Sequence, residues 1–224
     1  MDGELLSVNI ARQPGPTSQY EGLTGIDKRP FGGRVRVAAP GAPGVGGSGL
    51  AGDVICTRKF HGGDDQAVYA YAREDLDWWS GQLDRPLADG MFGENLTTRG
   101  LDLAGALVGE RWRVGRQVVL EVTSPRVPCQ TFAEKLGEAH WVKRFTEYGA
   151  TGAYLRVIEP GEIQSGDRIE VLSRPEHHVT VGYYFRVMMS ERAQYPQLIA
   201  PAGDALPLKA RKLLDADADA EADA

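Results

Sequence analysis

Several features are scarce in this sequence, and each scarcity excludes a class of protein. Only two cysteines are present among 224 residues, Cys56 and Cys129, and they lie far apart in the chain. A disulfide-rich secreted scaffold and a four-cysteine structural zinc site are therefore excluded. No apolar run approaches the roughly 18 to 20 residues of a transmembrane helix, and the opening residues lack the basic region of a secretory signal. We therefore expect a cytoplasmic protein without a membrane partner.

A basic surface is also missing. The formal net charge is −6, from 25 basic and 31 acidic residues. Segment 215–224 alternates Asp or Glu with Ala and holds five of these acids, which leaves 25 basic and 26 acidic residues in the body. A nearly neutral body argues against a nucleic acid polymer as partner. A small anionic molecule can still bind in a local basic pocket, so we expect a small-molecule ligand.

What the sequence does contain is an ordinary folded composition, 42% hydrophobic and 25% charged. Alternating and β-branched runs predict strands over 5–11, 34–39, 52–60, 111–123 (as a hairpin), 152–158 and 168–172. Apolar residues at helical spacing predict helices over 66–83 and 132–148, the second interrupted near Gly137. The stretch 40–52 has too many glycines for regular structure, and both a flexible surface loop and a loop that closes around a ligand fit it.

The pattern changes after Pro175. Thr180 is a good N-cap for a helix, and shorter helical pieces follow around Leu198 and over 209–214. We therefore expect a mainly β (α+β) body over 1–174, a small helical C-terminal domain over 175–214 and a disordered acidic tail over 215–224.

Cys129 has the most distinctive chemical setting. It follows a predicted strand, comes after Pro125 and Pro128, and has Arg126 three positions before it. A nearby guanidinium favours the thiolate, which is the form that attacks sulfur or binds a soft metal. A buried, inert thiol is the alternative, and Cys56, inside a predicted strand, fits that alternative better.

A second cluster comprises Lys59, His61, Gly62 and Gly63. The two glycines let main-chain N–H groups approach an anion, while Lys59 and His61 supply side-chain donors. The cluster is not a P-loop, because the required Gly-Lys-Ser/Thr is absent.

A third cluster is the turn around Glu94 and Asn95. A carboxylate and a carboxamide side by side can fix the polar edge of a heterocycle. Glu94 also has the chemistry for proton transfer, although an exposed acidic residue in a turn is the alternative interpretation.

The clusters occur in the order found in bacterial MOSC-domain proteins, and the chain most resembles the YiiM-type branch. The motifs that carry the resemblance are Lys59-Phe60-His61-Gly62-Gly63, Gln66-Ala67-Val68-Tyr69, Phe92-Gly93-Glu94-Asn95-Leu96, Gly109-Glu110-Arg111-Trp112, Ser124-Pro125-Arg126-Val127-Pro128-Cys129 and Gly152-Ala153-Tyr154-Leu155-Arg156-Val157. They cover most of residues 1–174. The segment after Pro175 is similar to the short three-helix C-terminal domain of that branch.

The resemblance implies a β-barrel-like MOSC domain that binds the molybdenum cofactor (molybdopterin). Cys129 would be the ligand to molybdenum and a catalytic residue, and the pterin and its phosphate would contact Lys59, His61, Gly62, Gly63, Asn95 and Arg126. The branch is associated with reduction of N-hydroxylated bases such as 6-hydroxylaminopurine, in which Glu94 is our expected proton donor.

Electrons would come from a separate reductase, either a flavoprotein or an iron–sulfur protein, because the sequence has no flavin or nicotinamide fingerprint. Pyridoxal phosphate is not expected, and an oligomer is compatible with the sequence. Two other functions fit the same thiol: a sulfur carrier or sulfurtransferase that holds a persulfide on Cys129, and a module that binds the pterin without turnover.

Overall fold

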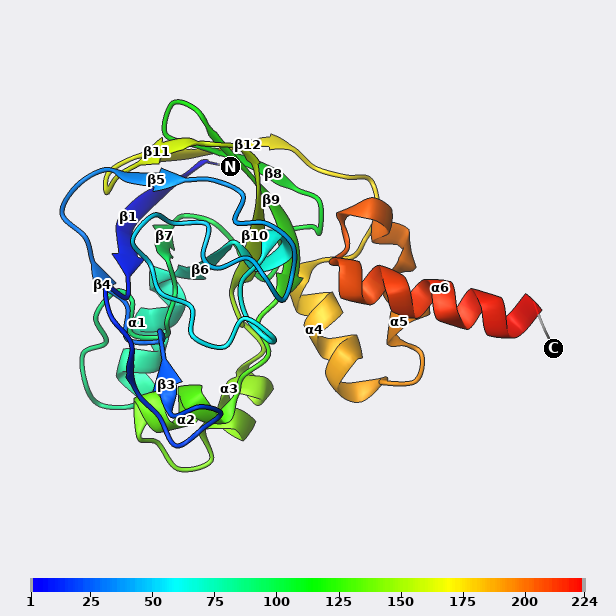
Figure 1. The fold of residues 1–224 in the computed structure, drawn as a ribbon, viewed down its shortest axis with the longest axis horizontal. Helices are drawn as coiled ribbons and strands as arrows, with labels where there is room; N and C mark the ends of the chain where they lie inside the picture. The colour runs from blue at the N-terminus through cyan, green and yellow to red at the C-terminus, as the bar shows by residue number, and fades with distance from the viewer. Residues whose placement is uncertain (1, 223–224) are drawn as a thin grey trace.

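The computed structural model describes residues 2–222, and its centre is a closed barrel of seven strands (Figure 1). The strands are hydrogen-bonded in the order β12-β8-β9-β10-β6-β7-β1, and β1 pairs with β12 to close the ring. All neighbours are antiparallel except β6 and β7, which are parallel. Their bounds are β1 Asp2–Ile10, β6 Val68–Ala72, β7 Leu96–Arg99, β8 Arg111–Val114, β9 Val118–Pro125, β10 Ala153–Glu159 and β12 Arg168–Ser173. The barrel expected from the sequence is confirmed.

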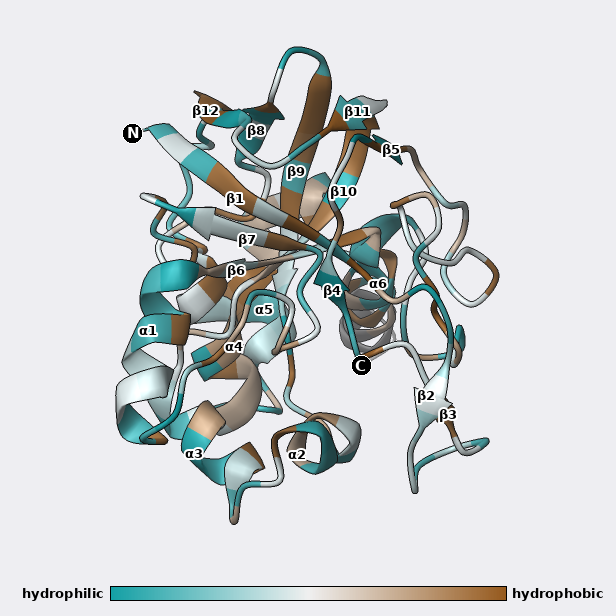
Figure 2. Cartoon of the chain, turned by 90° about the vertical axis from the view of Figure 1, so that its left-hand side faces the viewer, coloured by the Kyte–Doolittle hydropathy of each residue, from teal (hydrophilic) through white to brown (hydrophobic). Residues whose placement is uncertain are grey.

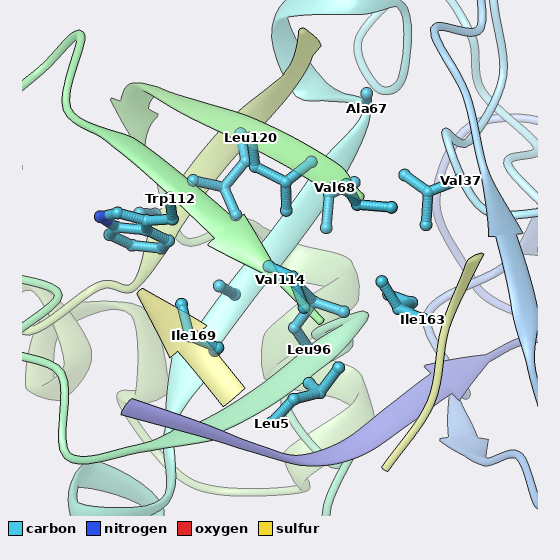
Figure 3. Close-up of a cluster of buried hydrophobic side chains, with 14 of the residues drawn as sticks. Leu5, Val37, Ala67, Val68, Leu96, Trp112, Val114, Leu120, Ile163 and Ile169 are labelled. Carbon is cyan, nitrogen blue, oxygen red and sulfur yellow. The ribbon is translucent and has the colours of Figure 1, made fainter. Parts of the chain in front are cut away.

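Aliphatic side chains fill the barrel. Leu5, Trp112 and Leu120 come from three different strands and point into one cluster (Figure 3), and each is almost completely buried. β-branched and leucine side chains suit a pleated, buried surface, which explains why the run Val118–Val122 forms most of strand β9, all of whose residues are buried. The hairpin predicted over 111–123 is confirmed as β8 and β9, which pair from Arg111–Glu121 to Val114–Val118.

The helix predicted over 66–83 is wrong in its first part. Residues Val68–Ala72 form strand β6, and a helix, α1 (Arg73–Gln82), begins only after it. All five residues of β6 are buried between β10 and β7, so their apolar character reflects a strand enclosed on both faces. A short apolar run of this kind has no period that distinguishes strand from helix.

The strand predicted over 52–60 is also wrong. Residues 53–61 form turns and irregular chain; His61 N bonds locally to Thr57 O (3.1 Å), while Val54 N donates to Ala11 O (3.0 Å). The stretch 40–52 is irregular, as its glycines predict, apart from one bridge between Val37 and Leu50. The remaining short strands are β2 (Gly15–Pro16), β3 (Leu23–Thr24), β4 (Arg29–Pro30), β5 (Val35–Val37) and β11 (Gly161–Ile163); β2 pairs with β3, β5 with β11, and β4 with β1.

Aromatic side chains hold three helices against one end of the barrel. The helical pattern over 132–148 is confirmed as α2 (Gln130–Leu136) and α3 (Trp141–Tyr148), with Gly137 in the left-handed conformation that ends α2. Trp79 of α1 lies 4.5 Å from Trp141, between ring centroids, and both pack with Phe92 and Phe145.

The C-terminal helices form a separate cluster beside the barrel (Figure 1). They are α4 (Val181–Ser190), α5 (Tyr195–Ile199) and α6 (Leu208–Ala222), with a 3-10 turn, η2 (Ala200–Ala205), between the last two. The predicted cap of α4 is present, since Thr180 Oγ1 accepts a hydrogen bond from Tyr183 N (3.0 Å). Asp65, in the 3-10 turn η1 (Asp64–Gln66), ties this cluster to the barrel by accepting from Leu208 N (2.8 Å) and pairing with Arg156 of β10.

Helix α6 extends into the segment for which we expected disordered chain, and residues 223–224 of that segment lie outside the described residues. Alternating Ala with Asp or Glu supports a helix as well as a solvated coil, because alanine has the highest helix propensity. None of the helices within residues 2–222 combines the length and apolar content that a membrane crossing requires.

Candidate functional site

The candidate site is a pocket beside the barrel, built mainly by irregular segments that approach from distant parts of the sequence. Its lining comes from the β2–β3 hairpin and the chain after it, the turn around Thr57, η1, the turn before β7, the segment between β9 and α2, and Tyr154 of β10. Five of the predicted site residues line it: His61, Gly62, Asn95, Arg126 and Cys129. The other three predicted site residues, Lys59, Gly63 and Glu94, do not line it.

Arg126 is the buried cation of this pocket. Its guanidinium lies 4.1 Å from the ring centroid of Phe132 and 4.9 Å from that of Tyr69, and Nη1 donates to the carbonyl oxygen of Phe92. Stacking on aromatic faces fixes the guanidinium plane and suits Arg better than Lys. The nearby Tyr69, Tyr154 and Cys129 raise the pKa of Arg126 above its ordinary value, even though burial acts the other way. The pocket therefore holds a permanent positive charge.

Lys28 supplies a second buried cation, which the sequence analysis missed. Its ammonium bonds both carboxylate oxygens of Asp53, at 2.6 and 2.5 Å, and the Asp53 side chain is completely buried. Burial lowers the pKa of Lys28, and the Asp53 carboxylate opposes this shift. No local motif signals Lys28, because its partner lies 25 residues away and only the fold brings them together.

Two thiols line the pocket, where the sequence analysis expected one. Cys129 is the N-cap residue of α2 and is half-buried, and its carbonyl accepts from Phe132 N and Ala133 N, both at 3.1 Å. Cys56 was expected as an inert residue inside a strand; it is half-buried on the irregular chain before Thr57 and also lines the pocket. Burial raises the pKa of Cys56, while the charge of Lys28 lowers it.

Glu94 lies below the pocket, not in it. Its carboxylate is fully buried and accepts from Gly90 N (2.5 Å), Phe92 N (3.0 Å) and Thr97 Oγ1 (2.9 Å). Burial raises its pKa to about 7. These bonds fix the turn that leads into β7, so Glu94 is a buried, hydrogen-bonded acid and not the exposed turn residue of the alternative interpretation.

Asn95 connects this turn to its surroundings. Its Oδ1 accepts from Tyr69 N (3.1 Å), and its Nδ2 donates to Asp53 Oδ2 (2.9 Å) and to Asn9 O (3.3 Å). The carboxamide thus links the turn before β7 to Tyr69 and positions the Asp53 carboxylate that pairs with Lys28.

The second predicted cluster is only partly brought to the pocket. His61 and Gly62 line it, whereas Lys59 is exposed, with its Nζ 5.4 Å from the Phe60 ring centroid. Gly62 has φ +79°, and a Cβ there would lie 2.5 Å from Gly47 O, so only glycine fits. Gly63 donates its N–H to Gly47 O (3.0 Å), which ties this turn to the stretch 40–52. Burial and the charge of Arg126 lower the pKa of His61.

Gln66 also lines the pocket and carries an unused acceptor. Its Oε1 is buried and has no hydrogen-bond partner among residues 2–222. A buried polar atom without a partner costs free energy unless a ligand or ordered water satisfies it. Gln66 belongs to the motif Gln66-Ala67-Val68-Tyr69, and nothing in that motif alone indicates a role for its side chain.

Comparisons with known proteins agree with this architecture. The family model described as the MOSC domain matches residues 57–170. YflK of Bacillus subtilis is 36% identical over 186 residues, which are 82% of this chain and 79% of that protein. A protein of Gibberella moniliformis named Reductase is 34% identical over 131 residues, 57% of this chain and only 23% of that protein.

Among solved structures, the crystal structure of YiiM from Geobacillus stearothermophilus superposes with a TM-score of 0.75 and 26% sequence identity. The superposition covers 95% of this chain and 97% of that one. The extent of this match includes the C-terminal helices as well as the barrel. The chain therefore belongs to the MOSC domain family, and its fold is that of a YiiM-type member.

Proposed function

We propose that the protein is a molybdenum-cofactor-dependent reductase of N-hydroxylated bases or related N-oxygenated compounds. The observation that carries the proposal is the pocket itself, where the Cys129 thiol lies with two buried cations, Arg126 and Lys28. Thiolates are ligands for soft metals, and Arg and Lys are the usual partners of phosphate. The name of the Gibberella relative, Reductase, supports the same reaction class.

The residues present fit a pterin cofactor with an anionic phosphate. Arg126 and Lys28 would hold the anionic part, and Gln66 Oε1 would accept from an N–H group of the ring, which satisfies an otherwise unpartnered atom. Within residues 2–222, no three His, Cys, Asp or Glu side chains converge as a metal site. A metal held by the organic cofactor, with one protein thiolate from Cys129, agrees with that arrangement.

The bound cofactor would supply the electrons that cleave the N–O bond of the substrate. Reduction of an N–OH group to an amine and water takes two electrons and two protons. The chain itself binds and orients the reactants and supplies one proton to the leaving oxygen, and water supplies the other. Since Glu94 does not line the pocket, we assign the proton to His61, which does. Its lowered pKa makes the protonated imidazole a stronger acid than usual. Electrons would reach the site from a separate flavoprotein or iron–sulfur reductase.

A sulfur carrier is the second candidate, and the presence of Cys56 in the same pocket favours it. A persulfide on one cysteine is attacked by a second thiol to form a disulfide and release sulfide, so two thiols suit sulfur delivery. The discriminating quantity is the bound metal, since a carrier has labile sulfur without molybdenum or pterin.

The test is elemental analysis for molybdenum, with pterin fluorescence after oxidation, on protein from a host that makes the cofactor. We expect stoichiometric molybdenum in the wild type, a large loss in Cys129→Ala, and retention in Cys56→Ala, the matched control from the same pocket. Folded protein without metal and pterin, but with labile sulfur on Cys129, would overturn the reductase proposal in favour of the carrier.

A further inference from the structure

The mouth of the pocket carries large apolar side chains that are exposed to water. Tyr20, at the tip of the β2–β3 hairpin, lines the pocket and is 54% exposed; Phe60, in the turn before His61, is 50% exposed and does not line the pocket itself, but its ring contacts that of Tyr20. Leu23 and Val127 are also about half exposed, and together with Tyr20 they line the pocket. Apolar surface gathered at the mouth of a pocket marks a place where a ligand or partner binds.

The rings of Tyr20 and Phe60 contact each other. The centroids of Tyr20 and Phe60 lie 5.3 Å apart with an interplanar angle of 36°. The residues are 40 positions apart in sequence, so the fold and not local chain geometry brings them into contact. Aromatic side chains present large, rigid apolar faces with few rotatable bonds, and planar rings bind such faces by stacking.

The hairpin that carries Tyr20 is held in place by one carboxylate. Glu134 of α2 accepts from Thr17 Oγ1 (2.8 Å), Ser18 N (3.1 Å) and Gln19 Nε2 (2.8 Å), and also from the Ser18 hydroxyl. Figure 2 shows β2 and β3 as an arm that extends from the barrel, so these bonds are its tether to α2. Because Cys129 caps the same helix, the tether fixes the hairpin tip relative to the thiol.

Tyr20 itself has an unusual backbone. Its φ is +50°, in the left-handed region that bulky side chains rarely adopt. The surrounding bonds hold it there, since Thr17 N donates to Gly22 O (3.1 Å) and Gly22 N donates to Gln19 O (3.0 Å). A bulky aromatic residue held in a strained conformation, with half its surface in water, indicates that the ring's position is used.

We propose that Tyr20 and Phe60 form a stacking site for the planar ring of the substrate at the pocket mouth. This inference rests on the proposed function and assigns recognition of the substrate's planar ring to these two side chains. The ring stacks against the Tyr20–Phe60 pair, and its N–O group is directed toward Cys129 and His61 in the pocket. Tyr20 and Phe60 thus determine specificity, and neither takes part in the chemical step.

The test compares Tyr20→Leu and Phe60→Leu with the wild-type holoenzyme, on 6-hydroxylaminopurine and on N-methylhydroxylamine, with a reduced viologen as electron donor. Leucine keeps the apolar surface and removes the ring. Stacking of a base on an aromatic side chain corresponds to roughly 5- to 150-fold in affinity. We expect the KM for the purine to rise by that factor, with kcat and the KM for N-methylhydroxylamine unchanged.

Two controls make the result specific. Tyr20→Phe should keep the wild-type KM, and Trp78→Leu should leave it unchanged, because Trp78 is an aromatic residue of 43% exposure that does not line the pocket and packs against Trp79 and Tyr148 instead of Tyr20. An equal change for both substrates, or no change for the purine, would overturn the stacking site.

A binding measurement separates this inference from the proposed reaction. Titration calorimetry with adenine, an unreactive planar ring, should show weaker binding to Tyr20→Leu and Phe60→Leu than to the wild type. If the wild type reduces neither substrate but its adenine binding depends on these rings, the reductase proposal fails and the stacking site stands. If the wild type turns over and both variants bind adenine equally well, the stacking site fails alone.

Discussion

The interior of the barrel and the pocket beside it differ in both their backbone structure and the side chains they bury. The barrel interior is regular strand lined with aliphatic side chains, of which Leu120 and Val68 are completely buried. The pocket is mostly irregular chain, and it buries Lys28, Arg126 and the carboxylate that pairs with Lys28. Burial of charge is unfavourable unless each charge is paired, so such an arrangement indicates a ligand site more than a source of stability.

The two regions should therefore respond differently to substitution. A cavity in the barrel interior should lower the free energy of unfolding without changing ligand binding. Loss of one charge in the pocket should lower the free energy of unfolding and also weaken ligand binding.

Asp53→Ala should be the most destabilising single change in the pocket. It removes the partner of the buried Lys28 ammonium and the acceptor for Asn95 Nδ2 and Ala11 N. Removing one member of a buried ion pair costs about 3 to 5 kcal/mol, and the additional lost bonds favour the upper end. Asp77→Ala is the control, since Asp77 pairs with Arg73 at an exposed position. Denaturant unfolding measures both; equal losses would contradict the distinction.

Leu120→Ala tests the barrel. The side chain is completely buried in the cluster with Trp112 and Leu5. We expect a loss of about 4 kcal/mol in unfolding free energy, from lost burial plus the cavity that remains. Molybdenum content per folded protein should stay at the wild-type value, because Leu120 does not line the pocket. Loss of molybdenum from the folded variant would show that the barrel interior also contributes to the metal site, contrary to this distinction.

Glu94 should make stability depend on pH. Its folded-state pKa is raised from 4.5 to about 7, so the folded protein binds this proton more tightly than the unfolded chain. The contribution of this group is therefore most favourable below pH 4.5 and is lost as the pH rises to about 7. A difference of this size corresponds to about 3 kcal/mol. Unfolding free energies of wild type and Glu94→Gln, measured from pH 4.5 to 8, should differ in slope over that window; parallel curves would contradict the assignment.

Sequence patterns predicted the barrel better than the site, and particular residues show why. The hairpin of β8 and β9, the break at Gly137 and the Thr180 cap are local signals, and all three are confirmed. The run Val68–Ala72 was assigned to a helix because a strand buried on both faces shows no alternation.

The site depends on pairings between distant residues, which no local pattern records. Lys28 was missed because its Asp53 partner lies on another segment, and Cys56 was misjudged because the strand expected around it is irregular chain. Glu94 has a typical acid–base side chain, yet two backbone N–H groups and a hydroxyl occupy its carboxylate. The motifs thus identified which segments meet at the pocket. Which of their atoms face the ligand could be determined only from the folded structure.

Removal of the Glu134 carboxylate should cause the smallest change in stability, confined to the hairpin over 15–24. Its carboxylate is exposed, so its loss should change global stability little, in contrast to Asp53. The bonds from Thr17, Ser18 and Gln19 lower its pKa to about 2, so the tether is intact above pH 4 and is lost as the pH falls toward 2.

In Glu134→Ala, the hairpin over 15–24 should be cleaved faster by limited proteolysis at neutral pH, while the melting temperature stays near that of the wild type. Glu138→Ala, on the chain that follows α2, is the control and should leave hairpin cleavage unchanged. Because the tether positions Tyr20, Glu134→Ala should also raise the KM for the purine; faster cleavage with an unchanged KM would show that the hairpin acts independently of substrate binding.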